Sequence, residues 1–298
     1  MTAAAGFGRT ARLLLLGPLF YLPRAPWLGL LLLFLVALLT LLTQIGGVVL
    51  WLWLAVSDVL RRAAPGRLIG RRLAAVALFF PFYLGVSLLL VPPVAGAFGR
   101  VPLACWSDRG SDYGPLTRAT CLTNRNYAAP TARAALDATA ARLAVMAPVR
   151  RLVYLDAGFP FHAWFPMLPH LSHGDGRKID VALLFVDPGS RRPLPGRARS
   201  PIGYGGYVPP APDAPLPCAG IRSWRRWDFD WLQPLLPNLD LDVVALRGLL
   251  AALVASPRVA RVFIEPHIGA RLGMRHDKIR FQGCGAARHD DHIHIEFR

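Results

Sequence analysis

The chain has 298 residues, of which 54% are hydrophobic and only 17% charged, and it carries a formal net charge of +16. A soluble domain is about 45–50% apolar and about 25% charged, so a fully soluble, a disordered and a collagen-like protein are all excluded. Residues 1–100 contain one acidic residue and no His, Lys or Cys, whereas every His and Cys follows residue 104. The sequence therefore predicts a membrane region, residues 1–100, and one further domain, residues 101–298.

Two uncharged runs in the first 100 residues are long enough to cross a bilayer. One covers 33 residues from Ala25 to Ser57, and the other covers 27 residues from Leu73 to Gly99. Because about 20 apolar residues span a membrane as a helix, we expect spans at about 27–56 and 73–98. The first run is long enough to tilt or to break at residues 44–47. Both runs lie too far along the chain for a cleaved signal peptide.

The segment between the runs, residues 58–72, is basic, since it contains one acidic residue and five arginines, Arg61, Arg62, Arg67, Arg71 and Arg72. Short loops rich in Arg stay in the cytoplasm. The pattern predicts a multi-pass protein of the inner (cytoplasmic) membrane whose C-terminal domain lies in the periplasm or extracytoplasmic space. Three N-terminal basic residues, Arg9, Arg12 and Arg24, would then lie outside, unless an even number of spans precedes the loop.

The use of cysteine agrees with export. Residues 101–298, which we call the outer domain, contain an even number of cysteines without C-x-x-C spacing, namely Cys105, Cys121, Cys218 and Cys284. An even set without metal-site spacing predicts two disulfides in an oxidising compartment. Cys105–Cys121 is a plausible local pair, but the sequence leaves three connectivities open.

The outer domain mixes helical and strand patterns without regular alternation, which predicts an α+β fold. Helices are expected from Thr131 to about Met146 and over 241–255. Strands are expected at 152–155, 179–186, 259–264 and 292–297. A long loop rich in Pro, Gly and Arg, residues 187–220, is a candidate substrate-facing segment.

The eight histidines are unevenly distributed, because five lie in two short stretches, residues 170–180 and 289–294. In the first, a glycine-bearing turn separates His173 from Asp180, so the imidazole can fold back beside the carboxylate at the start of an apolar strand. In the second, His292 and His294 alternate with isoleucines, and this period of two places both imidazoles on one strand face. Zinc takes imidazole nitrogen and carboxylate oxygen tetrahedrally. The two stretches therefore predict a zinc site.

These stretches resemble the penicillin-insensitive murein endopeptidases, which belong to the LAS zinc peptidases (lysostaphin-type, D-Ala-D-Ala peptidases and the hedgehog domain). The shared pattern is His-x-Ser-His-x-x-Gly-x-x-x-Asp followed by His-x-x-His-x-His. It is met by His170, Ser172, His173, Gly176, Asp180, His289, His292 and His294. The resemblance covers roughly residues 130–298 and implies an LAS/hedgehog-like domain with an antiparallel sheet.

The resemblance also implies roles for six residues: zinc ligands His173, Asp180 and His294, and catalytic His292, His289 and His170. His292 would stand beside the water on the metal as a base or as a stabiliser of the transition state. Asp291 is its rival, although strand alternation points Asp291 away unless a bulge intervenes. Lys178 departs from the family pattern, which tends to carry an acid there, and its charge would oppose the metal if it faced the site.

By the same resemblance, the function is hydrolysis of peptidoglycan cross-links between D-alanine and a diamino acid by a zinc metallopeptidase. One alternative is a D,D-carboxypeptidase, which needs a cation for the terminal carboxylate, and the Arg-rich segment 187–225 could supply it. A second is a non-catalytic zinc-containing module that binds the cell wall. The expected partners are peptidoglycan peptides and membrane lipid, without nucleic acid, since an exported domain would not meet it.

The remaining polar and aromatic residues of interest are given structural interpretations. Asp175 and Asp290 are expected to be solvated loop acids. Surface positions are expected for His162, His267 and His276. Core packing is expected for Trp224, Trp227 and Trp231, with a sugar- or membrane-contacting surface as the alternative.

Overall fold

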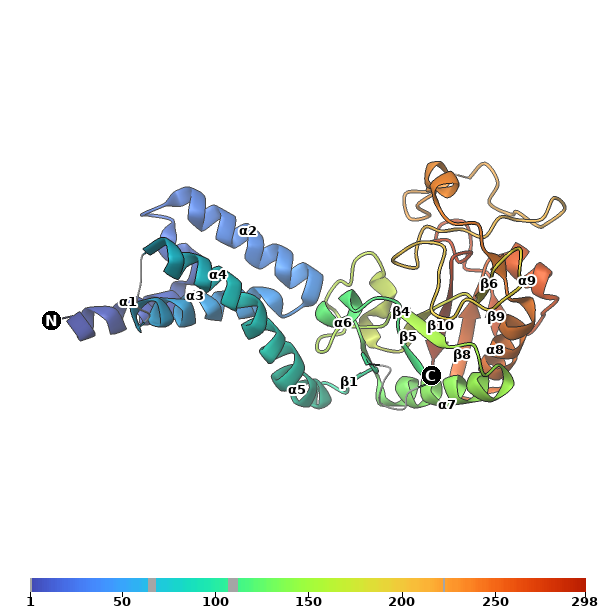
Figure 1. The fold of residues 1–298 in the computed structure, drawn as a ribbon, viewed down its shortest axis with the longest axis horizontal. Coiled ribbons are helices and arrows are strands. Elements are labelled where there is room, and N and C mark those ends of the chain that lie inside the picture. Colours follow the sequence, from blue (N-terminus) through green and yellow to red (C-terminus); the bar gives the residue numbers. More distant parts are fainter. Residues whose placement is uncertain (1, 64–67, 107–111, 222) are drawn as a thin grey trace.

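The computed structural model describes residues 2–63, 68–106, 112–221 and 223–298. A group of helices formed by the first 100 residues lies beside a mixed domain formed by the rest (Figure 1). The helical elements are α1 (Thr2–Leu16), η1 (Gly17–Tyr21), α2 (Pro26–Thr43), α3 (Gly46–Ala63), α4 (Leu68–Gly85), η2 (Val86–Leu90) and α5 (Val91–Ala97).

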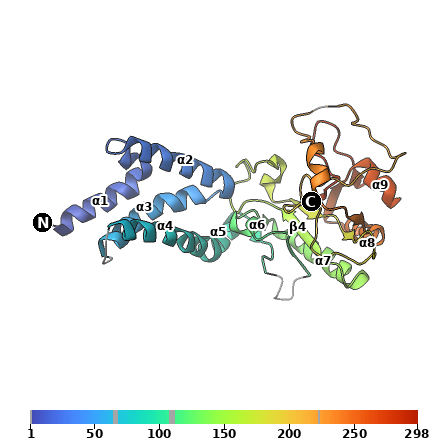
Figure 2. The same ribbon diagram turned by 45° about the horizontal axis from the view of Figure 1, so that its top comes forward.

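The first uncharged run, residues 25–57, does not form one helix, because α2 covers its first part and α3 its second. The chain turns at Gln44, which has a positive φ of 66°, and α3 then runs back along α2 (Figure 2). Close packing at the turn requires a glycine, because a Cβ on Gly47 would lie 1.9 Å from Oγ1 of Thr40. The sequence had allowed a break at residues 44–47, and the chain uses it.

Two helical stretches, Pro26–Thr43 and Arg72–Ala97, are long and apolar enough to cross a membrane. The second corresponds to the expected span at 73–98. Only 11% and 22% of their residues are buried within the protein, so most of their Leu, Phe and Val side chains are exposed. The exposed apolar side chains of such a helix need an apolar surrounding outside the protein. In a soluble protein, by contrast, the apolar side chains of a core helix are buried within the protein itself.

The outer domain is built on a six-stranded sheet in the order β2-β4-β5-β10-β8-β9. Its strands are β2 (Tyr113–Pro115), β4 (Leu152–Asp156), β5 (Lys178–Ala182), β10 (His292–Phe297), β8 (Val259–Phe263) and β9 (Ile279–Arg280). The inner pairs are antiparallel, but β2 pairs with β4, and β8 with β9, in parallel. The α+β class is therefore confirmed, whereas the sheet is mixed and not wholly antiparallel.

Short elements complete the domain. The expected strand at 179–186 is divided, because β5 ends at Ala182 and β6 (Phe185–Val186) pairs elsewhere with β7 (Asp240–Leu241). The others are β1 (Val101–Pro102), β3 (Tyr127–Ala128), α6 (Ala119–Leu122), η4 (Leu171–Asp175), η5 (Asp230–Leu235) and α9 (Pro266–Leu272).

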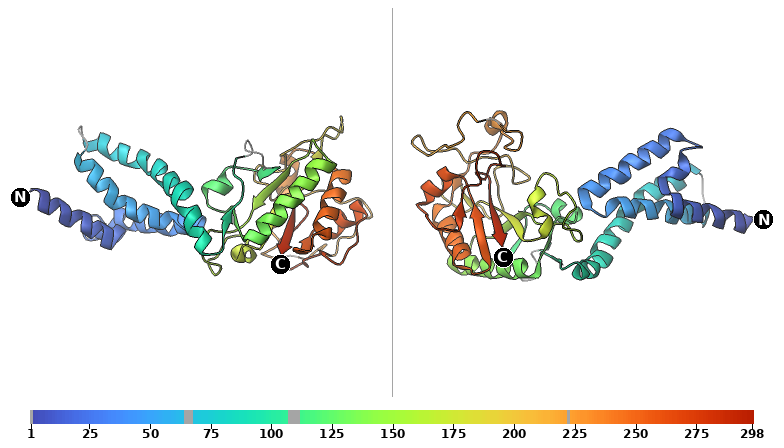
Figure 3. Two further views of the ribbon diagram at one scale, coloured as in Figure 1. Left: turned by 90° about the horizontal axis from the view of Figure 1, so that it is seen from below. Right: turned by 180° about the vertical axis from the view of Figure 1, so that it is seen from behind.

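One face of the sheet is covered by α7 (Pro130–Met146) and α8 (Val243–Ala255), which lie side by side (Figure 3). The domain core lies between them and the strands. Leu136 of α7 and Leu250 of α8 are fully buried there, together with the apolar residues of β5 and β10, Ile179, Val181, Ile293 and Ile295. Because strand side chains alternate, the polar residues of β5 and β10 face the other way. There they contact η4 and the loop that holds Tyr204, and we call this side of the sheet the polar face.

Both expected disulfides are present. They join Cys105 to Cys121, and Cys218 to Cys284. The first closes the irregular segment before α7. The second ties the end of the long loop 187–220, at Cys218, to Cys284 just before the His-rich stretch, and so links that loop to one side of the polar face.

Candidate metal centre

Three donor atoms meet on the polar face of the sheet. Antiparallel pairing of β5 with β10 places His294 opposite Asp180, with 2.7 Å between Nδ1 and Oδ1. His173 reaches the pair from η4, the turn before β5. Its Nε2 lies 3.3 Å from Oδ1 of Asp180 and 3.2 Å from Nδ1 of His294.

This donor set fits a zinc ion. Bonds of about 2.0–2.1 Å at tetrahedral angles place neighbouring ligand atoms about 3.3 Å apart. Both distances from His173 match that value, whereas the 2.7 Å between His294 and Asp180 is a hydrogen-bond distance. The exposed fractions of His173, Asp180 and His294 are 1%, 0% and 4%. Nδ1 of His173 donates to the carbonyl of Ala157 at 2.7 Å, which leaves the lone pair of Nε2 directed at the other two donors.

His170 also brings a ring nitrogen close to His173 and Asp180, within 4.8 Å. Its Nδ1, however, is bound by Oδ2 of Asp156 at 2.9 Å. His170 is therefore bound to a carboxylate outside the donor set, whereas the partners of Nδ1 of His294 are Asp180 and His173, both within the set.

The imidazoles around Asp180 keep it ionised. Burial alone would raise the pKa of this carboxyl, but His173, His292 and His294 hold that pKa well below its ordinary value. Oδ2 of Asp180 accepts a hydrogen bond from the hydroxyl of Tyr204 at 2.9 Å. Tyr204 therefore occupies one carboxylate oxygen and leaves Oδ1 toward the two histidines.

Two His–Asp pairs flank the donor set. Nδ1 of His292 is bound to Oδ1 of Asp291 at 2.5 Å, and its Nε2 faces Asp180 at 3.7 Å. Although burial opposes protonation, Asp180 and Asp291 raise the pKa of His292 to about 9. On the other side, His170 pairs with Asp156, whose charge is balanced by Arg125.

Asp291 stands behind His292 and does not replace it. It precedes the first residue of β10, so strand alternation does not determine its direction. Its Oδ2 accepts from the backbone N–H of Gly205 at 2.6 Å, while Oδ1 holds the His292 ring. This arrangement fixes the ring orientation of His292 and directs Nε2 at the donor set.

All six predicted site residues line one cavity of about 620 Å³. His289 contributes a buried ring whose centroid lies 4.9 Å from that of His292 and 5.6 Å from that of His294. Burial, together with the charges of His292 and His294, holds the pKa of His289 well below its ordinary value.

Sequence reasoning missed Tyr204, Asp156 and Arg125 as members of this site. Tyr204 packs on His170 and His292 with ring centroids 4.6 and 4.9 Å apart. Its position inside the loop 187–220, which had been considered substrate-facing, was the one available signal. Asp156 ends the apolar strand β4, and a polar residue at that place could have been recognised as pointing to a site.

Two acids differ from their expected surroundings. Asp175 is half-buried, and the ammonium of Lys178 binds it at 2.6 Å, so the charge of Lys178 is balanced outside the cavity. Asp290 was expected in solvent but is 1% exposed. Burial raises the pKa of Asp290 to about 6 although Arg288 opposes the shift.

The expectation for His267 is also wrong, whereas His162 and His276 are exposed as expected. His267 lies in α9, is 5% exposed, and approaches the carbonyl of Val208 at 3.2 Å. His267 is therefore buried, and not at the surface, because a backbone carbonyl from a distant segment supplies its polar contact.

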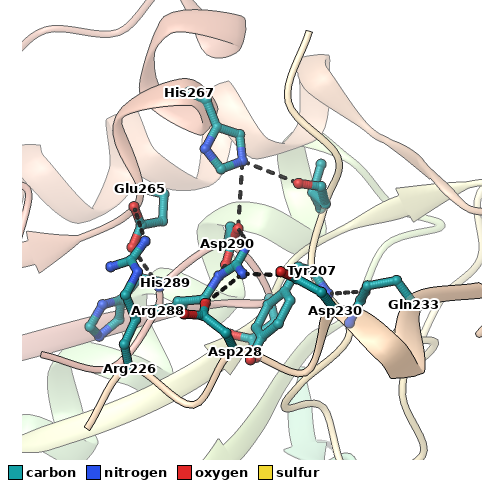
Figure 4. Close-up of polar contacts among 12 residues, drawn as sticks. Tyr207, Arg226, Asp228, Asp230, Gln233, Glu265, His267, Arg288, His289 and Asp290 are labelled. Atoms are coloured by element: carbon teal, nitrogen blue, oxygen red, sulfur yellow. Dashed lines mark hydrogen bonds and ion pairs between the residues drawn. The ribbon is translucent and has the colours of Figure 1, made fainter. Parts of the chain in front are cut away.

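Arg288 connects the His-rich stretch to Asp228 and Tyr207, which belong to other segments (Figure 4). Its guanidinium binds Asp290 at 2.6 Å and Asp228 at 2.9 Å, and it lies 3.6 Å from the ring centroid of Tyr207. Together with the disulfide from Cys218, these contacts fix the segment 216–235 beside the cavity.

The tryptophans of segment 216–235 are exposed, so the expectation of core packing is wrong. Trp224, Trp227 and Trp231 are 77%, 46% and 72% exposed. Trp224 and Trp227 line the cavity that holds the donor set. Ion pairs and a disulfide attach the segment to the rest of the domain. Its position therefore does not depend on burial of the indole rings.

No family model matches the chain. A stretch of 70 residues, 24% of the chain, is 37% identical to CBL-interacting protein kinase 16 of Oryza sativa subsp. japonica. The match covers 14% of that protein's length. A similarity over so small a part of both proteins does not assign this chain to a family.

Proposed function

We propose that the chain is a membrane-anchored LAS-type zinc peptidase that hydrolyses the peptide cross-links of peptidoglycan. The observation that carries the proposal is the convergence of His173 Nε2, Asp180 Oδ1 and His294 Nδ1 within 2.7–3.3 Å. The spaced motifs that supply these residues support the family assignment and the substrate class.

His173, Asp180 and His294 would hold the metal. Bound zinc polarises a scissile carbonyl and lowers the pKa of a water molecule to about 7. Tyr204 orients the carboxylate of Asp180, and the hydrogen bond from His173 to Ala157 orients its imidazole. These contacts fix the donors before a metal arrives, which lowers the cost of assembling the site.

His292 would move the proton at the reacting centre. Its Nδ1 is bound to Asp291, so Nε2 is the nitrogen that would face the reacting centre. A ring whose pKa is raised to about 9 would stabilise the developing negative charge there or protonate the leaving amine. His170, held by Asp156, faces the same cavity from the other side and would bind the substrate carbonyl or the developing charge. The His292 ring is buried and the His170 side chain is 15% exposed, which limits their contact with bulk water.

The cavity favours an endopeptidase but also contains a feature of a carboxypeptidase. A second cavity adjoins it, and the two share Trp224, Arg226 and Arg288 as lining residues, so a substrate chain can continue past the donor set. Arg226 is 8% exposed and binds Glu265 at 3.4 Å. Its Nη1 has no hydrogen-bond partner among the described residues. A D,D-carboxypeptidase, in which Arg226 binds a terminal carboxylate, is therefore the second candidate.

The helical region would cross the cytoplasmic membrane with its basic end inside. Arg9 binds Asp58 at 3.1 Å, and Arg61 approaches the same carboxylate at 3.9 Å, so the N-terminal helix and the basic segment lie at one end. The turn at Gln44 lies at the other end, where Oε1 of Gln44 accepts from the backbone N–H of Phe161 at 2.9 Å. With α2 and α3 as a hairpin, all these arginines lie on the cytoplasmic side, which agrees with the positive-inside rule.

The test uses the full chain in a membrane mimetic, loaded with zinc and incubated with cross-linked muropeptide dimers. Mass spectrometry follows the products, with a chelator and His292→Ala as controls. Chelator-sensitive conversion of dimers to monomers is the expected result. Release of terminal D-alanine identifies the carboxypeptidase instead. A chain that holds zinc yet yields no product contradicts the peptidase and leaves the non-catalytic wall-binding module.

A further inference from the structure

The last apolar helix ends against the turn that carries His173. Helix α5 ends at Ala97, and Gly99 then takes a φ of 68°, after which the backbone N–H of Arg100 returns to the carbonyl of Ala95 at 2.9 Å. This helix end turns the Arg100 side chain into the outer domain, where the residue is 6% exposed.

The guanidinium of Arg100 binds two carbonyl oxygens of that turn. Nη2 donates to Gly174 at 2.6 Å, and Nη1 donates to Asp175. Gly176 makes the approach possible, because a Cβ on it would lie 2.1 Å from Nη1. The motif glycine therefore serves a left-handed backbone, with φ of 68°, and also leaves room for the arginine.

The turn needs such support from outside. Element η4 is a single 3-10 turn of five residues, and 3-10 turns have poorer hydrogen-bond geometry than α-helices. His173 lies at its middle, and the next donor, Asp180, is fixed separately by the sheet. The position of His173 relative to Asp180 and His294 therefore depends on what holds η4.

The helices that present Arg100 are themselves fixed to the outer domain. The hydroxyl of Tyr83 in α4 donates to the carbonyl of Leu122 at 2.7 Å, and Asn124 donates to that hydroxyl at 3.0 Å. At the α2–α3 turn, Gln44 binds the backbone of Phe161. Two separate sets of hydrogen bonds therefore fix the helical region to the outer domain, and Arg100 reaches η4 from this fixed region.

We propose that Arg100 is a positioning residue for the metal site, so the helical region is a structural part of that site as well as an anchor. The inference rests on the proposed function only in taking zinc as the ion. A domain cut at residue 101 would lack this arginine, which follows the end of the last apolar helix and acts inside the outer domain.

The test compares Arg100→Ala and Arg100→Lys with the wild-type full chain in a membrane mimetic. Arg199→Ala is the matched control, because Arg199 is 8% exposed, close to the 6% of Arg100, and donates to a backbone carbonyl, that of Pro237, outside the metal centre. Zinc affinity is measured by competition with a chelator. We expect Arg100→Ala to weaken it about 10–100-fold, as loss of groups that orient metal ligands does. Arg100→Lys should restore part of the loss, and Arg199→Ala should leave affinity unchanged.

Hydrogen exchange of the metal-free chains gives a second readout that does not require zinc or activity. Faster exchange confined to residues 171–176 in Arg100→Ala supports the positioning role. Wild-type exchange there, or faster exchange that extends through β5 and β10, overturns it. If the wild-type chain binds no zinc, the proposed function fails, while the exchange result still decides the inference.

Discussion

The two faces of the central sheet bury their side chains to the same degree but with opposite chemistry. In β10, Ile293 and Ile295 are 0% exposed beneath the helices, while His292 and His294 on the other face are 3% and 4% exposed. Buried isoleucines stabilise the fold by leaving water. Buried imidazoles and carboxylates do not, unless they are paired or bind an ion. The comparison therefore separates the face that stabilises the domain from the face that carries the candidate metal centre.

The largest effect is expected from removing a donor on the polar face. His294→Ala should lower kcat/KM about 1,000-fold or more, because a bound metal supplies several kcal/mol of transition-state stabilisation. Zinc content should fall with it, while the midpoint of thermal unfolding of the metal-free chain stays close to the wild type. His276→Ala, at an exposed position, is the control. Retained zinc and activity in His294→Ala would remove this residue from the ligand set.

The next effect is expected from the residue that moves the proton. His292→Ala should lower kcat about 100-fold or more, in the range of general acid–base catalysis, with zinc still bound at one ion per chain. Asp291→Asn keeps the ring but weakens its orientation, so it should fall between the wild type and His292→Ala. Steady-state kinetics with zinc analysis checks both. Equal activity in all three chains would exclude His292 from the reaction.

The opposite face should respond in stability and not in chemistry. Leu250→Ala in α8 removes a side chain that is 0% exposed, and such core truncations cost about 2–5 kcal/mol. The free energy of unfolding should fall accordingly, while kcat of the folded fraction and zinc affinity remain unchanged. A loss of zinc affinity at full folding would show that the two faces are not independent.

The smallest effect is expected at the wall of the cavity. Trp224→Ala removes an exposed indole that stabilises little, so thermal unfolding should not change. KM for cross-linked muropeptides should rise by roughly tenfold, the equivalent of about 1.4 kcal/mol of lost contact, with kcat nearly constant. Trp231→Ala, which does not line the cavity, is the matched comparison. An unchanged KM in Trp224→Ala would separate this wall from substrate binding.

Local patterns in the sequence predicted the parts of the molecule that depend on neighbours in the chain. The alternation in His292–Phe297 predicted strand β10 with its correct bounds and faces, and the helix expected from Thr131 starts one residue earlier, at Pro130. The resemblance to the murein endopeptidases also named six residues, five histidines and Asp180, that line one cavity.

Features that depend on distant partners were not predictable in this way. His267 is buried because Val208, from another segment, supplies its contact. Asp290 pairs with its chain neighbour Arg288, but that guanidinium is itself fixed by Asp228 and Tyr207 from distant segments. Trp224 is exposed because a disulfide and ion pairs, and not its own packing, hold its segment. The break at Gln44 needed the close approach of α3 to α2, and Arg100 bonds with a turn more than 70 residues away, which no local pattern records.

The most direct test of the polar face is the metal content and coordination of the full chain purified without added chelator. Elemental analysis with X-ray absorption spectroscopy at the zinc edge should give one zinc per chain, with only nitrogen and oxygen ligands at about 2.0–2.2 Å. His294→Ala should lose the ion. A wild-type chain that binds no zinc under these conditions, or binds it equally well in His294→Ala, would contradict the account.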